Sequence, residues 1–273
     1  MPSLGSFILI FNEAPFIAMH LASWLPHLSE MVFYDGGSTD GTLEIIMEFK
    51  KSHPDGRKIK LFKNKNPKNL REDYTRLFDE CLHELSTDLA AFIHPDFYLE
   101  EPGNLANLDG GLSYTMSLRS FAGNPWGPLF EIIGRGEKWK NIYTLRPNLG
   151  LHYMGTYGSA EEDCYYREIT GNEYANYGQQ FDKYPYEVVD SGAKVWHFSD
   201  VRTPSRRLER MRSVLTNQGY DKGSIYELAV NHPRVSLQSG NGFEFVPAEY
   251  PIEFLAAREK YAHLMKVKEP ACA

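Results

Sequence analysis

The sequence predicts an α/β protein with an open sheet, and the N-terminal region carries this prediction. Two apolar runs, at 7–11 and 31–34, each stop at polar residues, as buried parallel strands do. Between them, residues 14–28 repeat apolar side chains at helical spacing, which predicts a strand, helix, strand unit with a right-handed crossover. Ligands bind beyond the carboxyl ends of the strands in such sheets. The polar residues that follow each run therefore mark a candidate site.

Later segments extend the same alternation. The pattern predicts a helix at 43–51, a strand at 58–62, a helix at 70–85 and a strand at 89–93. Strands that alternate with helices in this way support an open α/β sheet. The sequence contains no internal repeat, low-complexity tract or flexible linker that would divide the chain.

Composition excludes several classes of protein. The formal net charge of −7 argues against a general nucleic-acid binder, so we expect no nucleic-acid partner. The sequence has no long apolar run and no basic N-terminal segment followed by an apolar one, so we expect neither a membrane span nor a secretion signal, and a cytoplasmic location. The cysteines, Cys81, Cys164 and Cys272, are too few and too scattered for a disulfide framework or a zinc knuckle.

The loop after the second predicted strand reads Asp-Gly-Gly-Ser-Thr-Asp-Gly-Thr, from Asp35 to Thr42. Asp35 can accept two hydrogen bonds from a base edge or a ribose diol, and the glycines allow a ligand to approach the backbone closely. Ser38 or Asp40 can cap the helix that begins near Thr42. A plain strand-to-helix turn is the alternative, because it would have the same composition.

Together with the Asn-Glu pair after the first predicted strand, this loop resembles the nucleotide-sugar-binding half of family 2-type glycosyltransferases, which have the GT-A fold. Those enzymes carry an Asn-Glu motif and an Asp-Asp-Gly-Ser-Thr-Asp-Gly-Thr-like segment at these places, and this chain departs from the second at Gly36. The resemblance covers the region of residues 1–100. It implies that the nucleotide of a UDP-, GDP- or dTDP-linked sugar is bound by Phe11, Asn12, Glu13, Asp35 and Gly36.

The resemblance also implies the overall organisation. The fold class is then a GT-A-type open mixed sheet, with residues 1–100 as a nucleotide-sugar-binding half flanked by helices. Residues 101–273 would form the acceptor-binding half and the C-terminal helices within the same continuous domain. Arg76, on the helix predicted at 70–85, is a further candidate nucleotide contact, with a place on a solvated helix face as the alternative.

His94-Pro95-Asp96 follows the fourth predicted strand, where the family places a metal-binding Asp-x-Asp motif. A divalent cation there, Mn²⁺ or Mg²⁺, would bridge the two phosphates and neutralise the leaving nucleoside diphosphate. Asp96 keeps the second acid of the motif, while His94 replaces the first and could ligate manganese or hydrogen-bond the ribose or a phosphate. The alternative is structural, with His94 as a polar strand end and Asp96 as a helix cap or turn residue.

Three acids, Glu161, Glu162 and Asp163, follow in the order in which family members carry an acidic pair beside the acceptor. The second acid of that pair is the general base in inverting transfer, a role that needs a carboxylate within hydrogen-bond reach of the acceptor hydroxyl. The resemblance therefore assigns catalysis to Asp163, with Glu162 beside it and Glu161 as a solvated neighbour. Consecutive acids before a helix are also favoured simply by the helix N-terminus.

His197 lies in a strand-like segment, and many GT-A enzymes place a late histidine there to complete the metal site or contact a phosphate. A histidine between Trp and Phe is also typical of a buried structural residue. Arg202, Arg206 and Arg207 follow, and their guanidinium groups suit phosphate contact, with a solvated helix face as the alternative. A tyrosine-rich stretch at 143–186 offers a surface on which an acceptor sugar can stack.

Taken with these motifs, the resemblance implies a metal-dependent inverting glycosyltransferase that moves a sugar from a nucleotide-diphosphate donor to a carbohydrate hydroxyl. A nucleotidyltransferase on a similar sheet is a competing class, but it should begin with a glycine-rich phosphate loop containing Lys or Arg, unlike the segment 12–16. A second alternative is a family relative that binds nucleotide or glycan without transfer, which the departures at Gly36 and His94 motivate. Transfer or hydrolysis of a sugar nucleotide would separate an enzyme from a binder.

Overall fold

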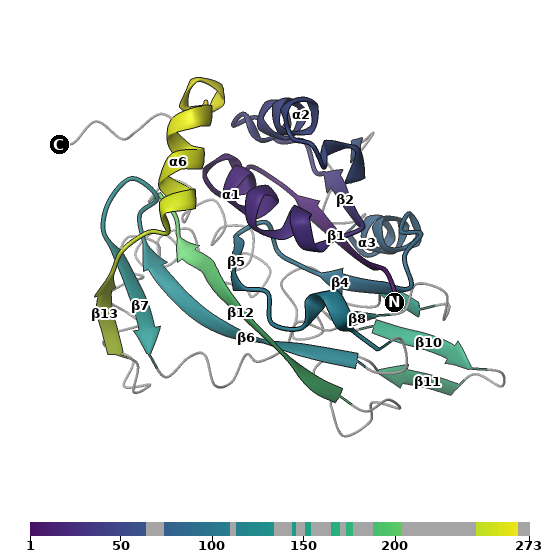
Figure 1. Ribbon diagram of the computed structural model, residues 1–273. Coiled ribbons are helices and arrows are strands. Elements are labelled where there is room, and N and C mark those ends of the chain that lie inside the picture. Colours follow the sequence, from purple (N-terminus) through teal and green to yellow (C-terminus); the bar gives the residue numbers. More distant parts are fainter. Residues whose placement is uncertain are drawn as a thin grey trace, which may run out of the picture.

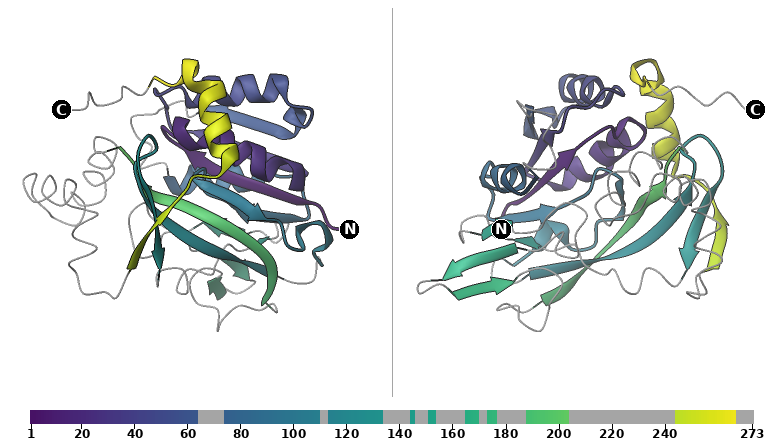
Figure 2. Two further views of the ribbon diagram at one scale, coloured as in Figure 1. Left: turned by 60° about the vertical axis from the view of Figure 1, so that its left-hand side comes forward. Right: turned by 180° about the vertical axis from the view of Figure 1, so that it is seen from behind.

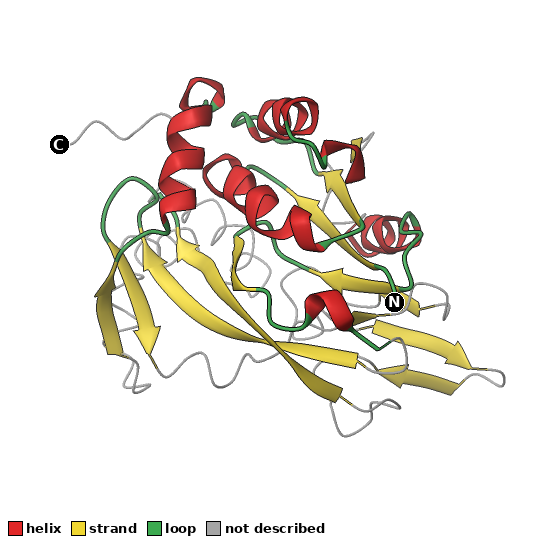
Figure 3. Cartoon of the chain, viewed as in Figure 1, coloured by secondary structure: helices red, strands yellow, loops and turns green. Residues whose placement is uncertain are grey.

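The computed structural model describes residues 1–63, 74–109, 113–133, 144–145, 151–153, 165–169, 173–176, 188–203 and 244–266. The strands within these ranges form three sheets (Figure 1). The longer helices gather above the long strands of the second sheet in Figure 3. In the described ranges, no helix has the length and apolar character needed to cross a membrane.

The first sheet has the strand order β3-β2-β1-β4-β8. Its members are β1 (Leu4–Ile10), β2 (Glu30–Asp35), β3 (Ile59–Lys63), β4 (Leu89–Phe92) and β8 (Thr144–Leu145). The first four strands run parallel, and β8 joins β4 in antiparallel orientation. Strands β1, β2 and β4 are buried along almost their whole length, as in a parallel sheet that is covered on both faces. The predicted open mixed α/β sheet is confirmed.

The described α-helices are α1 (Ala14–Trp24), α2 (Thr42–Ser52), α3 (Tyr74–His83) and α6 (Ile252–Tyr261). The helix predicted at 14–28 ends earlier, at Trp24, and passes into a 3₁₀ turn, Leu25–His27. Pro26 lies in this turn, and its missing N–H and its ring prevent the α-helix from continuing. Helix α1 packs against α2, α6 and the second sheet, so it is the element around which the layers assemble.

The second sheet has the order β13-β7-β6-β12-β5. Its members are β5 (Phe97–Glu101), β6 (Ser113–Gly123), β7 (Leu129–Ile133), β12 (Val188–Val201) and β13 (Glu244–Ala248). Strand β12 pairs parallel with β6 and antiparallel with β5 (Figure 2). A third sheet contains β9 (Leu151–Tyr153), β10 (Tyr165–Ile169) and β11 (Glu173–Asn176) in antiparallel order.

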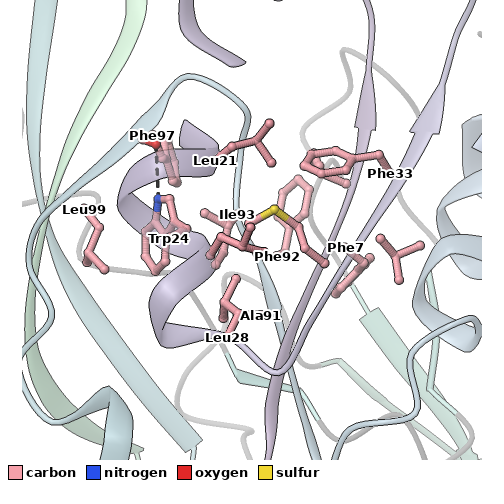
Figure 4. Close-up of a cluster of buried hydrophobic side chains, with 14 of the residues drawn as sticks. Phe7, Leu21, Trp24, Leu28, Phe33, Ala91, Phe92, Ile93, Phe97 and Leu99 are labelled. Carbon is pink, nitrogen blue, oxygen red and sulfur yellow. Dashed lines mark hydrogen bonds between the residues drawn. The ribbon is translucent and has the colours of Figure 1, made fainter. Parts of the chain in front are cut away.

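The main hydrophobic core lies between α1 and the first sheet. Its largest side chains come from three neighbouring parallel strands and from α1 (Figure 4), and they include Phe7, Leu21, Trp24, Phe33 and Phe92. All of them are buried. Full burial of each such side chain contributes about 1.5–3 kcal/mol, so this core fixes α1 firmly on the strands.

Two side chains of α1 hold the start of β5. The indole N–H of Trp24 donates a hydrogen bond of 3.1 Å to the carbonyl of Phe97 (Figure 4), and Nδ1 of His20 lies 3.0 Å from the same oxygen. Burial lowers the pKa of His20 to about 4, so the ring is neutral at pH 7 and can donate from Nδ1. Because Phe97 directly follows Asp96, α1 fixes the backbone that carries this carboxylate.

A second cluster of aromatic rings ties β12 and α6 to α1. The ring of Phe16 in α1 stacks on Phe198 of β12 with a centroid distance of 5.8 Å, and it lies 5.9 Å from Phe254 of α6. All three side chains are buried. The first and second sheets are therefore joined through α1, which contributes different side chains to the two clusters.

The C-terminal turn, Ala262–Leu264, packs on the loop that follows β2. Gly41 in this loop has φ of 102°, and a Cβ added to it would lie 2.0 Å from the carbonyl oxygen of Leu264. The backbone N–H of Lys266 donates to the carbonyl of Asp40 at 2.7 Å. Only glycine fits at position 41, because both the backbone conformation and the space exclude a side chain.

We predict that Gly41→Ala destabilises the fold more than Gly192→Ala does. Gly192 also has a positive φ, of 72°, but an added Cβ there would meet its nearest atom at 3.9 Å. The control should therefore show backbone strain alone, about 1 kcal/mol, while Gly41→Ala adds a clash with backbone and should cost about 3 kcal/mol or more. Urea unfolding measures both, and equal losses would contradict the packing of the C-terminal turn on this loop.

Candidate functional site

Asn12 locks the loop after β1 against the loop after β2. It has φ of 56°, a left-handed conformation that Asn tolerates better than most residues. Its backbone N–H donates to the hydroxyl of Ser38 at 2.9 Å, and its side-chain oxygen accepts the N–H of Thr39 at 2.7 Å. Phe11 precedes it directly at the end of β1, so the predicted nucleotide-binding residues of this loop lie beside the glycine-rich loop.

Asp35 shapes the loop in which it lies. Its carboxylate accepts the backbone N–H of Gly37 at 3.1 Å and that of Ser38 at 3.0 Å, and the residue is only 3% exposed. The N–H of Gly36 donates to the carbonyl of Ile10 at 2.8 Å, which continues the ladder between the two strands. The role of Asp35 in binding a base or ribose stays a prediction, and the structure adds that the same carboxylate orders the loop backbone.

Asp40 connects the starts of two helices. One carboxylate oxygen accepts the N–H of Thr42, the first residue of α2, at 3.1 Å, and the other accepts the N–H of Ala14, the first residue of α1, at 3.0 Å. The hydroxyl of Thr42 in turn accepts the N–H of Glu13 at 2.8 Å. Gly41 is the N-cap residue of α2, and Asp40 before it accepts the first backbone N–H of the helix, so Asp40 fixes the entry of both helices relative to each other.

The His94-Pro95-Asp96 segment forms the turn from β4 to β5. The N–H of Phe97 donates to the carbonyl of His94 at 3.0 Å, and the carbonyl of Asp96 accepts the N–H of Phe198 in β12 at 3.0 Å. The Asp96 side chain is 7% exposed. The turn is therefore pinned to β12, and its carboxylate points into the protein.

A buried arginine meets this carboxylate. Nη2 of Arg202, the residue after β12, lies 2.7 Å from Oδ2 of Asp96 and 3.6 Å from Oε2 of Glu13. Arg202 is 7% exposed, which excludes the solvated-face alternative for this residue. We call Glu13, Asp96 and Arg202 the Arg202 cluster. The sequence does not predict this pairing, because Asp96 and Arg202 are separated by 106 residues. No local sequence pattern around either residue indicates its partner.

The surroundings of Arg202 stabilise its charge. Its Nη1 donates to the carbonyls of Phe198 and Val201, each at 3.0 Å, and its guanidinium lies 4.8 Å from the ring centroid of Phe16. Burial opposes the charged form of Arg202, but Glu13 and Asp96 outweigh it and raise the pKa of the guanidinium. The cluster therefore contains a permanent positive charge between two carboxylates.

His197 also reaches Asp96, as the strand position predicted for it allows. It lies in β12, with Nε2 at 4.0 Å from Oδ1 of Asp96. Its ring packs edge-on against Phe97, and the ring centroids of His94 and His197 are 6.2 Å apart. The structure thus brings together the three residues that the sequence suggested for a metal site, His94, Asp96 and His197.

The Arg202 cluster lies at the switch point of the parallel sheet. From β1 the chain passes to β2 and β3 on one side and to β4 on the other. Open α/β sheets bind ligands at such a point, beyond the carboxyl ends of the strands. Glu13 follows β1 and Asp96 follows β4, so the two acids of the cluster stand on either side of it.

The expected metal fits this arrangement poorly. Within the described residues, no three or more His, Cys, Asp or Glu side chains are grouped so that they could hold a metal ion. Oδ2 of Asp96 already accepts a hydrogen bond from Arg202, and an ion bound to that oxygen would lie next to a guanidinium of like charge.

The remaining residues that the sequence suggested for the site lie away from the Arg202 cluster or outside the residues that the structure describes. Arg76 lies on an exposed face of α3 and forms an ion pair with Glu80, as the solvated-face alternative expects. The proposed catalytic acids and the later arginines lie outside the described residues: Glu161, Glu162, Asp163, Arg206 and Arg207. Part of the tyrosine-rich stretch forms β9, β10 and β11.

The sequence matches no protein-family model and no curated protein. The structure is similar to a mannosyltransferase from Pyrobaculum calidifontis in complex with GDP-Man and Mn²⁺, at 14% identity and a TM-score of 0.43, covering 97% of this chain and 81% of that chain. It is also similar to GalNAc-T7 with UDP, GalNAc and Mn²⁺, at 9% identity and a TM-score of 0.43, covering 96% of this chain and 55% of that one.

A third similar structure is glucosyl-3-phosphoglycerate synthase from Mycobacterium tuberculosis in complex with phosphoglyceric acid. The identity is 16% and the TM-score 0.41, with 78% of each chain covered. This chain spans about half the length of the GalNAc-T7 chain. Glycosyltransferases are thus among the structures similar to this one.

We predict that Asp96→Ala destabilises the fold strongly, because it removes one of the two acids that compensate the buried Arg202. Breaking a buried ion pair from one side costs about 3–5 kcal/mol. Lys194→Ala is the control, since Lys194 pairs with Glu101 at 2.8 Å with both side chains about half exposed, and such solvent-exposed pairs contribute little to stability. Urea unfolding compares the two, and similar losses would show that the Arg202 cluster is not a buried ion pair in solution.

Proposed function

We propose that this protein binds a nucleotide-diphosphate sugar at the carboxyl ends of β1, β2 and β4 and transfers the sugar to a hydroxyl group of a carbohydrate acceptor. One observation supports the proposal most: polar residues of three separate motifs meet around the switch point of a parallel sheet. Asn12 and Glu13 follow β1, Asp35 ends β2, and Asp96 follows β4.

The nucleoside end of the donor is assigned to the two glycine-containing loops. The left-handed backbone of Asn12 and the hydrogen bonds from Asp35 to its own loop hold these backbones in one conformation. A loop that is ordered before the ligand arrives loses less conformational entropy on binding. Asp35 and Glu13 can accept hydrogen bonds from ribose hydroxyls or a base edge, and Gly36 and Gly37 let the ligand approach the backbone.

The transfer step is assigned to the acidic segment after β9. In this proposal Asp163 takes the proton of the acceptor hydroxyl as its oxygen attacks the anomeric carbon, and the bond to the nucleoside diphosphate breaks in the same displacement. One displacement inverts the anomeric configuration. Glu162 orients the acceptor, and the tyrosines of the stretch at 143–186 provide a stacking surface for its sugar ring.

The sequence also predicts a divalent cation, Mn²⁺ or Mg²⁺, beside the diphosphate. Asp96 and His197 are the described residues that would hold it, and it would neutralise the diphosphate. Because the carboxylate of Asp96 already pairs with Arg202, we assign no step to the ion.

A relative that binds sugar nucleotides without transferring the sugar is the second candidate. It is favoured by Gly36 and His94, which stand where relatives commonly carry acids. Incubation with sugar nucleotides and analysis of the products separates the two candidates, because only an enzyme releases nucleoside diphosphate.

We predict that saturating UDP, GDP or dTDP, with manganese present, raises the melting temperature by about 5 °C or more for the matching nucleotide, because a ligand that prefers the folded state stabilises it. Asp35→Asn keeps the size of the side chain and should lose most of this shift. Asp55→Asn, in the turn before β3, is the matched control and should keep it. If none of the three nucleotides shifts the melting temperature, the proposed donor site is wrong.

We also predict that Asp163→Asn lowers turnover by about a hundredfold or more, since the amide cannot take a proton. Donor affinity should stay close to that of the wild type, because the change lies on the acceptor side. Glu161→Gln should retain near-normal turnover and serves as the control. Normal turnover of Asp163→Asn, or a product with retained anomeric configuration, would remove Asp163 from this role.

A further inference from the structure

The carboxylate expected to bind a metal already has a cation beside it. Nη2 of Arg202 donates to Oδ2 of Asp96 at 2.7 Å and lies 3.6 Å from Oε2 of Glu13. All three side chains are largely buried. The guanidinium therefore stands where a cation shared by these two carboxylates would stand.

The surroundings of Arg202 hold its guanidinium in one orientation. One terminal nitrogen faces the acids, while the other donates to the carbonyls of Phe198 and Val201, and the plane lies near the ring of Phe16. A lysine offers a single nitrogen on a flexible stem and cannot make both sets of contacts. The arginine is thus held in place by backbone and ring as well as by its charge partners.

A metal would have to compete with this arrangement. A divalent ion on Oδ2 of Asp96 would displace the hydrogen bond from Arg202 and then face its positive charge in a site with little water to screen it. The Nδ1 atom of the buried His20 is engaged by the backbone carbonyl of Phe97.

We infer that Arg202 takes the place of a divalent cation at Asp96, and that a nucleoside diphosphate binds at this end of the sheet without a metal. The inference rests on the proposed function. In this arrangement Arg202 offsets the charge of Asp96 and Glu13 beside the diphosphate, and it is a positioning residue for these two carboxylates.

The test measures the affinity of the wild-type protein for UDP, GDP and dTDP by calorimetry, once with EDTA and once with Mn²⁺. The expected result is that the nucleotide that binds does so with the same affinity in both buffers, within about twofold. A tightening of about tenfold or more by Mn²⁺ overturns the inference while the proposed function stands. Absence of nucleotide binding in both buffers overturns the proposed function and the inference with it.

A titration with Mn²⁺ alone, followed by the electron spin resonance of the free ion, gives a readout without nucleotide. Saturable Mn²⁺ binding that Asp96→Asn abolishes would also overturn the inference. The expected result is no Mn²⁺ binding that depends on Asp96.

Variants of Arg202 test its part directly. Arg202→Met frees both acids, so nucleotide affinity in EDTA should fall about tenfold or more and Mn²⁺ should restore part of it. Arg119→Met is the control, because Arg119 also bridges two acids, Glu131 and Glu100, and lies 4.9 Å from the ring of Trp196. It should bind nucleotide as the wild type does.

If Arg202→Met does not fold, Arg202→Lys keeps the charge beside the two acids but loses part of the contacts of the guanidinium, so it should bind nucleotide more weakly than the wild type yet equally in EDTA and Mn²⁺. A folded Arg202→Met protein that binds nucleotide as tightly as the wild type in EDTA would overturn the assignment of Arg202.

Discussion

The buried ion pair between Asp96 and Arg202 is the contact on which the geometry of the candidate site depends. It joins the turn after β4 to the end of β12, so it links the parallel sheet to the second sheet at the edge where we propose that the nucleotide binds. A buried ion pair stabilises a fold only when further hydrogen bonds offset its desolvation. The carbonyls of Phe198 and Val201 and the ring of Phe16 provide these contacts.

Near this pair, polar residues of the loops after β1 and β2 form hydrogen bonds to the backbone of these same loops. Asp35 holds the backbone after β2, Asp40 joins the starts of α1 and α2, and Asn12 adopts a left-handed conformation to connect both loops. The loops at the carboxyl ends of β1 and β2 are therefore held in one conformation. Such order is what a nucleotide site requires, because the binding energy is then not used to fold the loops.

The parallel half of the fold could be predicted because its signals are local. Apolar runs that end in polar residues predicted β1 and β2. The helix was predicted to continue to residue 28 because the apolar spacing continues that far, although Pro26 indicates an earlier end. The site was predictable only in part. Asp96 was recognised by its place after β4, but its partner Arg202 comes from a distant strand, and only the packing of α1 on both sheets brings them together.

The measurement that tests the central claim most directly is a crystal structure of the protein grown with a nucleoside diphosphate and Mn²⁺. We expect the nucleoside beside Asn12 and Asp35 and the diphosphate beyond the ends of β1 and β4, with the contact between Asp96 and Arg202 intact and no metal ion bound to Asp96. A nucleotide bound elsewhere on the protein, or a manganese ion bound to Asp96 with Arg202 displaced, would contradict it.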